Sequence, residues 1–185
     1  RKDPVSFRLA LLKNSPRARE VIEEVVRMSQ WHSPRPVGRA LGIAYSDAWE
    51  THVAEVAEVS LDKKTGKVRV HEVWCAVDCG VALQPRNVAA QMESAIMFGL
   101  SAALAEKITF KGGVVQQSNF HDYPVLRMDE APLVHVNVIV TDNKPGGVGE
   151  VGLPPIAPAV ANALFKLNGG KRLHDLPFKA ELLKA

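Results

Sequence analysis

Residues 85–105 read PRNVAAQMESAIMFGLSAALA, and apolar side chains recur in this stretch at a spacing of four. That spacing places side chains on one face of an α-helix, and Pro85 is a favoured residue in a first helical turn. We therefore predict a long helix from Pro85 to about Ala105. An adjacent face carries small residues, among them Ala95 and Gly99, so another element is expected to pack very close to this helix.

The rest of the chain mixes strand and helix signals. DKKTGK joins two strand-like runs into a predicted hairpin, and KGGVVQQ predicts a second, smaller hairpin turn. The predicted strands cover residues 41–59, with a bend near Trp49, 68–77 and 133–140, the last being central in its sheet. Further helices are predicted over residues 15–28, with Ser15 or Asn14 as the cap, and over 156–167. Strands and helices without strict alternation favour an α+β fold, a mixed sheet with packed helices, and we expect a single domain over residues 1–185.

Composition and charge exclude two classes of function. The 185 residues are 46% apolar and carry a net charge of +3, from 23 Lys and Arg against 20 Asp and Glu. No basic stripe interleaved with aromatic residues occurs, so nucleic acid is not an expected partner. Charge, Gly or Pro interrupts every apolar run well before the roughly 20 residues that a membrane span needs, so no transmembrane segment is expected.

The first residues, RKDPVSF, contain neither an initiator Met nor an apolar signal core. We therefore interpret the chain as a piece of a longer protein, begun in mid-sequence, in which any targeting region would lie upstream of Arg1. The compartment stays open on this interpretation.

The two cysteines are expected to be ordinary core residues. Cys75 and Cys79 lie four positions apart in a strand-like run, so roughly 13 Å separates them. A disulfide requires Cα atoms within about 7 Å of each other. No further Cys and no suitably spaced His completes a zinc ligand set, and we predict no metal bound directly by side chains.

A glycine-rich turn, KPGGVGEVGLPPIAPAV at residues 144–160, places Glu150 among four glycines just before a proline-started helix. Local physics leaves more than one interpretation open. In the first, the turn is a plain connection with glycines at positive φ and a solvated Glu150. In the second, it is a phosphate-binding loop, but the glycine spacing matches neither common phosphate-binding pattern. In the third, Glu150 is a catalytic base, which nearby apolar residues partly desolvate and which the glycines leave open to a bulky reactant.

Three motifs in order carry a more specific signal: VDCGVALQPRNVAAQMESAIMFGLSAAL, YPVLRMDEAP and PGGVGEVGLPPIAPAVANAL. Together they resemble the C-terminal part of the molybdenum-binding large subunit of the xanthine oxidase and aldehyde oxidoreductase family. The resemblance is strongest to the bacterial isoquinoline oxidoreductase branch and covers almost the whole chain. It implies a C-terminal molybdopterin-binding domain of a subunit that oxidises N-heteroaromatics or aldehydes with oxygen from water. For such a bacterial protein, cytoplasm and periplasm are both open.

The resemblance also implies roles for individual residues. Glu150 matches the general base of the family, and Gln91 matches a glutamine that lies against the pterin part of the cofactor. Gly147, Val148 and Gly149 belong to the same cofactor-binding turn. The implied cofactors are molybdopterin cytosine dinucleotide, which carries the molybdenum, and two [2Fe-2S] clusters on a separate small subunit. The implied partners are that iron–sulfur subunit, the N-terminal part of the same large subunit and a small-molecule substrate.

Departures from the family pattern leave a rival interpretation open. Ser94 and Ala95 stand where the family has two glycines, and SDAWETH, residues 46–52, replaces a common His-Glu-Ser-Phe-Gly stretch. Crowding of the cofactor by these residues would leave a non-catalytic binding or scaffold module with the same fold. His121 and Asp122 form a tempting acid/base pair, but adjacent strand residues point to opposite faces, so we expect them to make hydrogen bonds in a loop.

Overall fold

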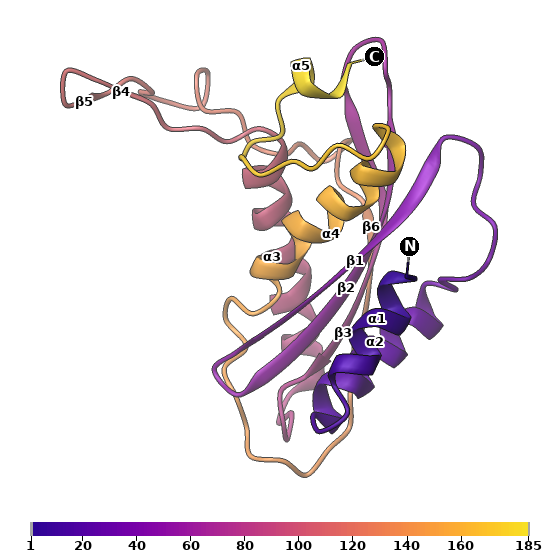
Figure 1. The fold of residues 1–185 in the computed structure, drawn as a ribbon. Coiled ribbons are helices and arrows are strands. Elements are labelled where there is room, and N and C mark those ends of the chain that lie inside the picture. The colour runs from indigo at the N-terminus through magenta and orange to yellow at the C-terminus, as the bar shows by residue number, and fades with distance from the viewer. Residues whose placement is uncertain (1, 185) are drawn as a thin grey trace.

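A four-stranded sheet lies between two pairs of helices in the computed structural model, which describes residues 2–184 (Figure 1). One face is covered by α1 (Pro4–Leu11) and α2 (Pro16–Met28), and the other by α3 (Pro85–Leu104) and α4 (Leu153–Leu167). Each of these helices has proline in its first turn, where the missing N–H costs no hydrogen bond. The predicted α+β class is confirmed.

The sheet has the strand order β1-β2-β3-β6. Strands β1 (Arg39–Ala48), β2 (Thr51–Leu61) and β3 (Val68–Asp78) pair antiparallel, and β6 (Leu133–Val138) pairs parallel to β3. The prediction that the 133–140 strand is central is wrong, because β6 forms one edge of the sheet. Alternation of polar and apolar residues indicates that one face of a strand is exposed to solvent. It does not indicate whether the strand has one neighbouring strand or two.

Residues 41–59 form parts of two strands and not one bent strand. Trp49 and Glu50 join β1 to β2 with φ angles of 50° and 62°, both in the left-handed region. Two consecutive left-handed residues make a tight turn that suits the twist of a hairpin. Such turns usually contain Asn or Gly, and residues 46–52 contain neither, so the sequence carries no signal for the reversal.

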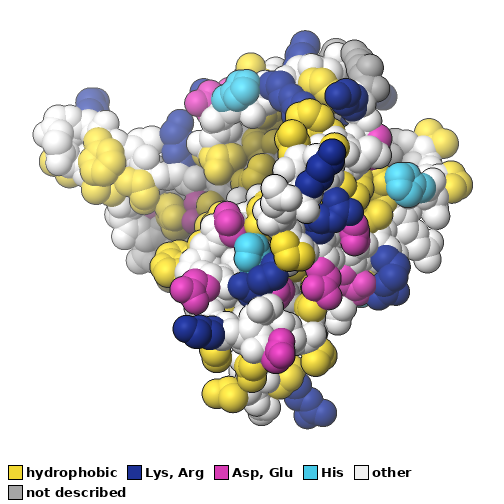
Figure 2. Space-filling model, turned by 60° about the horizontal axis from the view of Figure 1, so that its bottom comes forward, with side chains coloured by type: hydrophobic (Ala, Val, Ile, Leu, Met, Phe, Trp, Pro, Cys, Tyr) yellow, Lys and Arg dark blue, Asp and Glu magenta, His cyan; other side chains and the backbone are white. Residues whose placement is uncertain are grey.

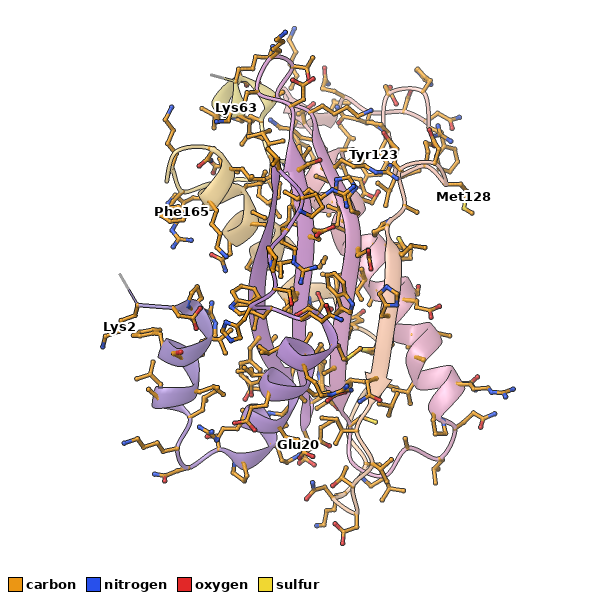
Figure 3. All side chains as sticks on the ribbon, turned by 90° about the vertical axis from the view of Figure 1, so that its right-hand side faces the viewer. Lys2, Glu20, Lys63, Tyr123, Met128 and Phe165 are labelled. Atoms are coloured by element: carbon orange, nitrogen blue, oxygen red, sulfur yellow. The ribbon has the colours of Figure 1, made fainter. Side chains whose placement is uncertain are left out.

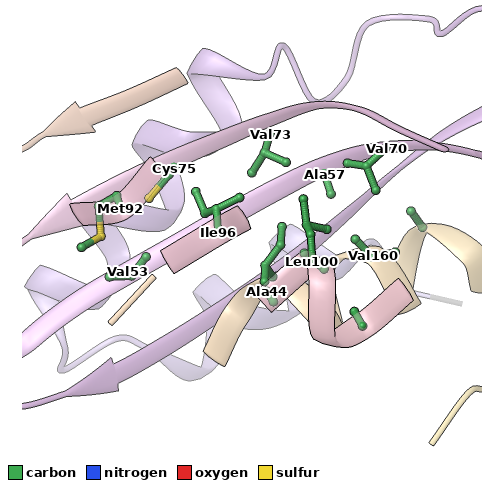
Figure 4. Close-up of a cluster of buried hydrophobic side chains, with 14 of the residues drawn as sticks. Ala44, Val53, Ala57, Val70, Val73, Cys75, Met92, Ile96, Leu100 and Val160 are labelled. Atoms are coloured by element: carbon green, nitrogen blue, oxygen red, sulfur yellow. The ribbon is translucent and has the colours of Figure 1, made fainter. Parts of the chain in front are cut away.

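The main core lies between the sheet and the helices α3 and α4 (Figure 4). Met92, Ile96 and Leu100 of α3 are fully buried and pack against valine and alanine side chains of the strands. A Cβ on Gly99 would lie only 2.3 Å from Ile156 Cγ2 of α4. The predicted close packing at the small-residue face of the long helix is therefore confirmed, and α4 is the element that packs there.

A smaller core lies between the opposite face of the sheet and the helices α1 and α2. Val21, Ile22 and Val25 of α2 are fully buried there, next to Val56 and Trp74. The helix α2 has the predicted bounds. The helix α1 was not predicted, because eight residues with apolar side chains on several sides give little periodicity.

An arm projects from the body between α3 and β6 (Figure 1). It contains the short strands β4 (Phe110–Lys111) and β5 (Val114–Val115), and Gly112 and Gly113 turn the chain between them with φ angles of 57° and 80°. The predicted small hairpin is confirmed. Figure 2 shows hydrophobic side chains on this arm in contact with solvent. The last helix, α5 (Ala180–Leu183), is a single short turn near the C-terminus.

The two cysteines and the His121–Asp122 loop have the surroundings that the sequence predicts. Cys75 and Cys79 are free and buried. Asp122 accepts backbone N–H groups of Ser118 and Asn119 at 3.0 Å, and His121 lies beside it, so the loop role of the pair is confirmed. None of the described helices has the length and apolar character to span a bilayer.

Candidate functional site

Four segments meet toward the lower end of the molecule in Figure 1. They are the β1–β2 turn, the loop after β3, the N-terminal half of α3 and residues 144–152, which lead into α4. Gly146 N donates to Cys79 O at 2.8 Å, and Gly147 N donates to Trp49 O at 2.9 Å. The glycine-rich turn is therefore fastened to the ends of two strands. On the face shown in Figure 2, acidic and basic side chains intermingle.

Gly146 and Gly147 are required by this close approach. A Cβ on Gly146 would lie 2.4 Å from Thr51 Oγ1, and a Cβ on Gly147 would lie 3.0 Å from Trp49 Cβ. None of the four glycines of the turn has a φ in the left-handed region. The first interpretation, a plain connection, is therefore wrong about the φ angles of the glycines, although Glu150 is exposed as that interpretation predicts.

Gly149 differs from its neighbours, because nothing in the described chain requires a glycine there. A Cβ at this position would meet only Gln91 Nε2, at 4.0 Å, and the φ angle lies outside the left-handed region that favours glycine. Gln91 itself is exposed, and its amide makes no hydrogen bond to a described residue. The structure thus places Gln91 beside Gly149 and leaves open space in front of both.

The same turn offers free hydrogen-bond donors. The backbone N–H groups of Val148, Gly149 and Glu150 have no acceptor within residues 2–184, and the side chain of Val148 packs on the main core. These groups precede α4, which begins at Leu153, three residues before the predicted start. Free N–H groups at the start of a helix favour ligand atoms that carry negative charge or accept hydrogen bonds.

Glu150 lies in the bend directly before α4, and its side chain is exposed. We expected apolar neighbours to desolvate this carboxylate. Val151 is instead turned into the core, and Leu153 is 41% exposed. Neither Gln91 nor Glu150 lines any of five surface hollows with volumes of about 260–500 Å³. The concavity that we expect in front of the two side chains is none of these five, and it stays a prediction.

Ser94 and Ala95, the two departures in the long helix, point to different surroundings. Ala95 is 5% exposed, and a Cβ on Gly152 would lie 3.3 Å from the Ala95 Cβ, so Ala95 faces the start of α4. Ser94 is exposed, one helical turn beyond Gln91. The methyl group of Ala95 therefore does not occupy the space in front of Gln91 and Gly149.

Sequence reasoning missed the groups that hold the site in place. Arg17 of α2 donates from Nε and Nη2 to the Asp78 carboxylate at 2.5 and 2.9 Å, and Asp78 Oδ1 also accepts Gly80 N at 2.9 Å. Burial alone would raise the pKa of Asp78, but the hydrogen bonds from Arg17 and Gly80 outweigh it and hold that pKa below its usual value. The Asp-Cys-Gly run at the end of a strand was the available signal for this anchor.

The β1–β2 turn is the second missed element. Trp49 is 61% exposed and stands beside Gly147, so the departure at residues 46–52 forms one wall of the candidate site. No cluster of His, Cys, Asp and Glu that could hold a metal ion occurs within residues 2–184. The site offers backbone amides, the Gln91 amide and the Glu150 carboxylate, which suit hydrogen bonding to an organic ligand and transfer of a proton.

Residues 27–132 match the family described as the molybdopterin cofactor-binding domain. The chain is 45% identical over 183 residues to the beta subunit of isoquinoline 1-oxidoreductase of Brevundimonas diminuta, covering 97% of this chain and 23% of that protein. It is 31% identical over 204 residues to a nicotinate dehydrogenase subunit of Pseudomonas putida, covering 99% of this chain and 17% of that protein. The chain thus spans about a fifth of the length of these relatives.

Solved structures share the fold. Quinoline 2-oxidoreductase from Pseudomonas putida 86 superposes with a TM-score of 0.66 at 20% identity, covering 71% of this chain and 18% of that one. The aldehyde oxidoreductase from Desulfovibrio desulfuricans superposes with a TM-score of 0.64 at 23% identity, covering 72% of this chain and 15% of that one.

Proposed function

The chain belongs to the molybdopterin cofactor-binding domain family, and from this premise we propose that it is part of the catalytic large subunit of a molybdenum hydroxylase. Relatives over nearly the whole chain are named for isoquinoline and nicotinate, and another is a nicotine 6-hydroxylase large subunit. A further relative is an aldehyde oxidoreductase molybdenum-binding subunit. The proposed reaction is the oxidation of an N-heteroaromatic compound or an aldehyde with oxygen derived from water.

The single observation that carries this proposal is the open space in front of Gln91 and Gly149. A glycine that neither the backbone angle nor the packing of its own chain requires indicates that another molecule approaches closely there. A flat pterin ring is such a molecule, and it carries several hydrogen-bond acceptors and donors. The residues present therefore fit the cofactor.

We propose that Gln91, Gly147, Val148 and Gly149 hold the cofactor. The Gln91 amide can both donate and accept a hydrogen bond, and the N–H groups of Val148 and Gly149 are free to donate. The Gly147 N–H donates to Trp49 O and is not free for the cofactor. The proposed role of Gly147 is to hold the turn in place and, without a side chain, to leave room for the cofactor. When bound, the cofactor supplies molybdenum, a Lewis acid that activates oxygen and accepts electrons.

Glu150 is the proposed general base. Its side chain is exposed and lies in the bend that precedes α4. The carboxylate accepts no hydrogen bond from a described residue. In this position it can accept a proton from the water-derived oxygen as that oxygen attacks the substrate carbon. Because this chain leaves Glu150 in solvent, the remainder of the subunit must exclude water from it when the site is complete.

The cofactor form and the partners follow from the family resemblance. We propose molybdopterin cytosine dinucleotide as the cofactor, an iron–sulfur small subunit with [2Fe-2S] clusters as the electron acceptor, and the N-terminal part of the large subunit as the other wall of the site. The rival proposal, a non-catalytic module, rests on the substitution of glycines by Ser94 and Ala95. The inward orientation of Ala95 weakens that rival, because its methyl group leaves the proposed cofactor space free.

The test uses the full-length subunit purified with its partners. Gly149→Val and Gln91→Ala are expected to lower the molybdenum content measured by mass spectrometry. The first places a side chain in the proposed cofactor space, and the second removes the amide that would bind the cofactor. Glu93→Ala, at an exposed position on another side of α3, is the matched control and should retain full metal. Unchanged molybdenum in both variants would refute the assignment of this surface.

Glu150→Gln separates binding from chemistry. We expect this variant to keep its molybdenum and to lose dye-linked oxidation of substrate by roughly 10²- to 10⁴-fold, the usual contribution of a general base. A subunit that contains molybdenum but has no dye-linked activity before mutation would instead support the non-catalytic rival.

A further inference from the structure

A second hollow lies on another side of the molecule, between α1, the edge strand β1 and the C-terminal half of α4. Its volume is about 500 Å³, within the range of small-molecule sites. Figure 3 shows Lys2, at the start of α1, and Phe165, on α4, on the same side of the molecule. None of the residues assigned above to the cofactor lines this hollow.

Positive charge dominates the lining of the hollow. Four cationic side chains line it together with two aromatic rings, and no carboxylate does: Lys2, Arg8, Lys166 and Arg172, with Trp31 and Phe165. The residues come from α1, from α4 and from the loops that follow α2 and α4, which lie far apart in the sequence. The tertiary structure alone creates this cluster.

Two of the cations are held over aromatic rings. Lys166 Nζ lies 4.5 Å from the centroid of the Trp31 ring, and Arg172 Cζ lies 4.0 Å from that of Phe165. Each ring fixes the direction of its cation without neutralising its charge. The charged groups are therefore oriented.

Part of their hydrogen-bonding capacity is used within the chain. Arg8 donates from Nη1 to Pro4 O at 3.0 Å and from Nη2 to Ile43 O at 3.4 Å, and Arg172 Nη1 donates to Asn162 Oδ1 at 2.7 Å. None of these acceptors is a carboxylate, so both guanidinium groups keep their full charge and their remaining N–H donors for an anion.

The nearest carboxylate is already engaged. Asp3 Oδ2 accepts Ser6 N at 2.8 Å, and Asp3 Oδ1 accepts Trp31 Nε1 at 3.3 Å. One carboxylate also cannot balance four cations. Burial and then repulsion by Arg172 lower the pKa of Arg8, while Asp3 acts in the opposite direction, and burial lowers the pKa of Lys166. Asp3 therefore offsets only part of the unfavourable electrostatics at Arg8.

Capping of the sheet edge explains only part of this cluster. Lys166 Nζ donates to Leu41 O at 2.8 Å, and Asn162 Nδ2 donates to Ile43 O at 3.0 Å, so these side chains satisfy carbonyl groups at the free edge of β1. A neutral amide such as Asn162 serves this purpose as well as a cation does. Arg8 Nη2 also donates to Ile43 O, at 3.4 Å. Edge capping thus accounts for hydrogen bonds of Lys166 and Arg8, but it requires donors and not the excess of positive charge.

We propose that this hollow binds a small ligand through a phosphate or diphosphate group. Arg8 and Arg172 contribute guanidinium charge and the N–H donors that the chain leaves unused, and Lys166 adds a further cation beside the sheet edge. A group with two or more negative charges removes the repulsion among the cations. Free pyrophosphate and an organic diphosphate share this chemistry.

The experiment uses calorimetry at 0.15 M salt to measure how pyrophosphate and ADP bind to the full-length subunit, with adenosine as the uncharged control. Saturable binding of pyrophosphate or ADP, and none of adenosine, is expected. Arg8→Gln and Arg172→Gln should each weaken binding by about tenfold or more, because each removes a positive charge together with its charge-assisted donors. Lys63→Gln, an exposed site in the β2–β3 turn outside the hollow, should leave the affinity unchanged.

The two probes distinguish the sources of the phosphate. Tighter binding of ADP than of pyrophosphate assigns an organic ligand, and equal binding assigns the free anion; both outcomes support the site. Absence of saturable binding, or binding that neither arginine variant weakens relative to Lys63→Gln, would overturn the proposal. Arg172 is exposed, so its variant tests the site even if Arg8→Gln disturbs α1.

Discussion

Glu55 shows at the scale of one residue how burial sets the behaviour of a side chain. It lies in the middle of β2, paired across the sheet with Ala44 and Cys75, and is fully buried. Neither carboxylate oxygen has a hydrogen-bond partner among the described residues. Burial raises the pKa of Glu55 well above its usual value of 4.5, so the folded chain favours the protonated, neutral form.

We predict that Glu55 makes the stability of this domain fall as pH rises. The pKa is raised in the folded state, so the stabilisation is complete below the unfolded pKa of about 4.5 and is lost as pH rises through the folded pKa. The loss is at most about 1.4 kcal/mol for each pH unit. Denaturant unfolding at several pH values should show this slope in the parent and not in Glu55→Gln. Equal slopes in both proteins would contradict the prediction.

At the scale of elements, the helix α4 is held against β1 by direct contact of two backbones. Gly42 makes this contact possible, because a Cβ there would lie 2.0 Å from Ala159 O and 2.3 Å from Ala163 N. A different contact joins α2 to β3, where Arg17 pairs with an Asp78 side chain that is 1% exposed. Each face of the sheet thus has one attachment that depends on a single residue.

Gly42→Ala is predicted to destabilise the domain by about 1–3 kcal/mol or more, because the methyl group forces α4 away from β1. Gly149→Ala is the matched control, since its Cβ would meet only Gln91 Nε2 at 4.0 Å. It should change the free energy of unfolding by less than about 0.5 kcal/mol. Denaturant unfolding of the two variants decides, and equal stabilities would show that α4 does not rely on this approach.

Arg17→Ala is predicted to cost about 3–5 kcal/mol, because it leaves the buried Asp78 carboxylate without its cation. Arg19→Ala on the same helix breaks the exposed pair with Glu23 and a hydrogen bond from Arg19 Nη1 to Leu9 O at 2.8 Å, and it should cost less than about 2 kcal/mol. Thermal and denaturant unfolding of both variants provide the comparison. Similar losses in the two would mean that the Arg17 pair behaves as a surface pair.

At the scale of the whole molecule, the chain presents one part of a site and an uncovered apolar arm. Glu150 and Gln91 face solvent, although the proposed chemistry requires water to be excluded from them. Large apolar side chains of α3, the arm and the loop beyond it are also exposed: Phe98, Phe110, Phe120 and Met128. Both features agree with the proposal that a further part of the large subunit completes the site.

The 185-residue chain expressed alone is therefore predicted to contain no molybdenum and to self-associate. A cofactor held by only part of its hydrogen-bond set does not offset its loss of translational freedom, about 4–15 kcal/mol at standard state. Exposed apolar surface favours association between copies. Metal analysis and light scattering, with the full-length subunit as control, test both points. Stoichiometric molybdenum in the isolated chain would show that Gln91 and the Glu150 turn suffice to bind the cofactor.

The sequence by itself determined most of the local elements, though neither α1 nor the β1–β2 turn, and the residue types of the glycine-rich turn. A spacing of four predicts the helix that begins at Pro85, and turn residues predict two hairpins, because periodicity and turn propensity depend on neighbours along the chain. Only the tertiary structure decided that β6 lies at an edge, that Trp49 reverses the chain, and that Gln91 meets Gly149. These features depend on contacts between segments distant in sequence. The exposure of Glu150 has the same origin, because desolvation is produced by whatever packs against a side chain in space.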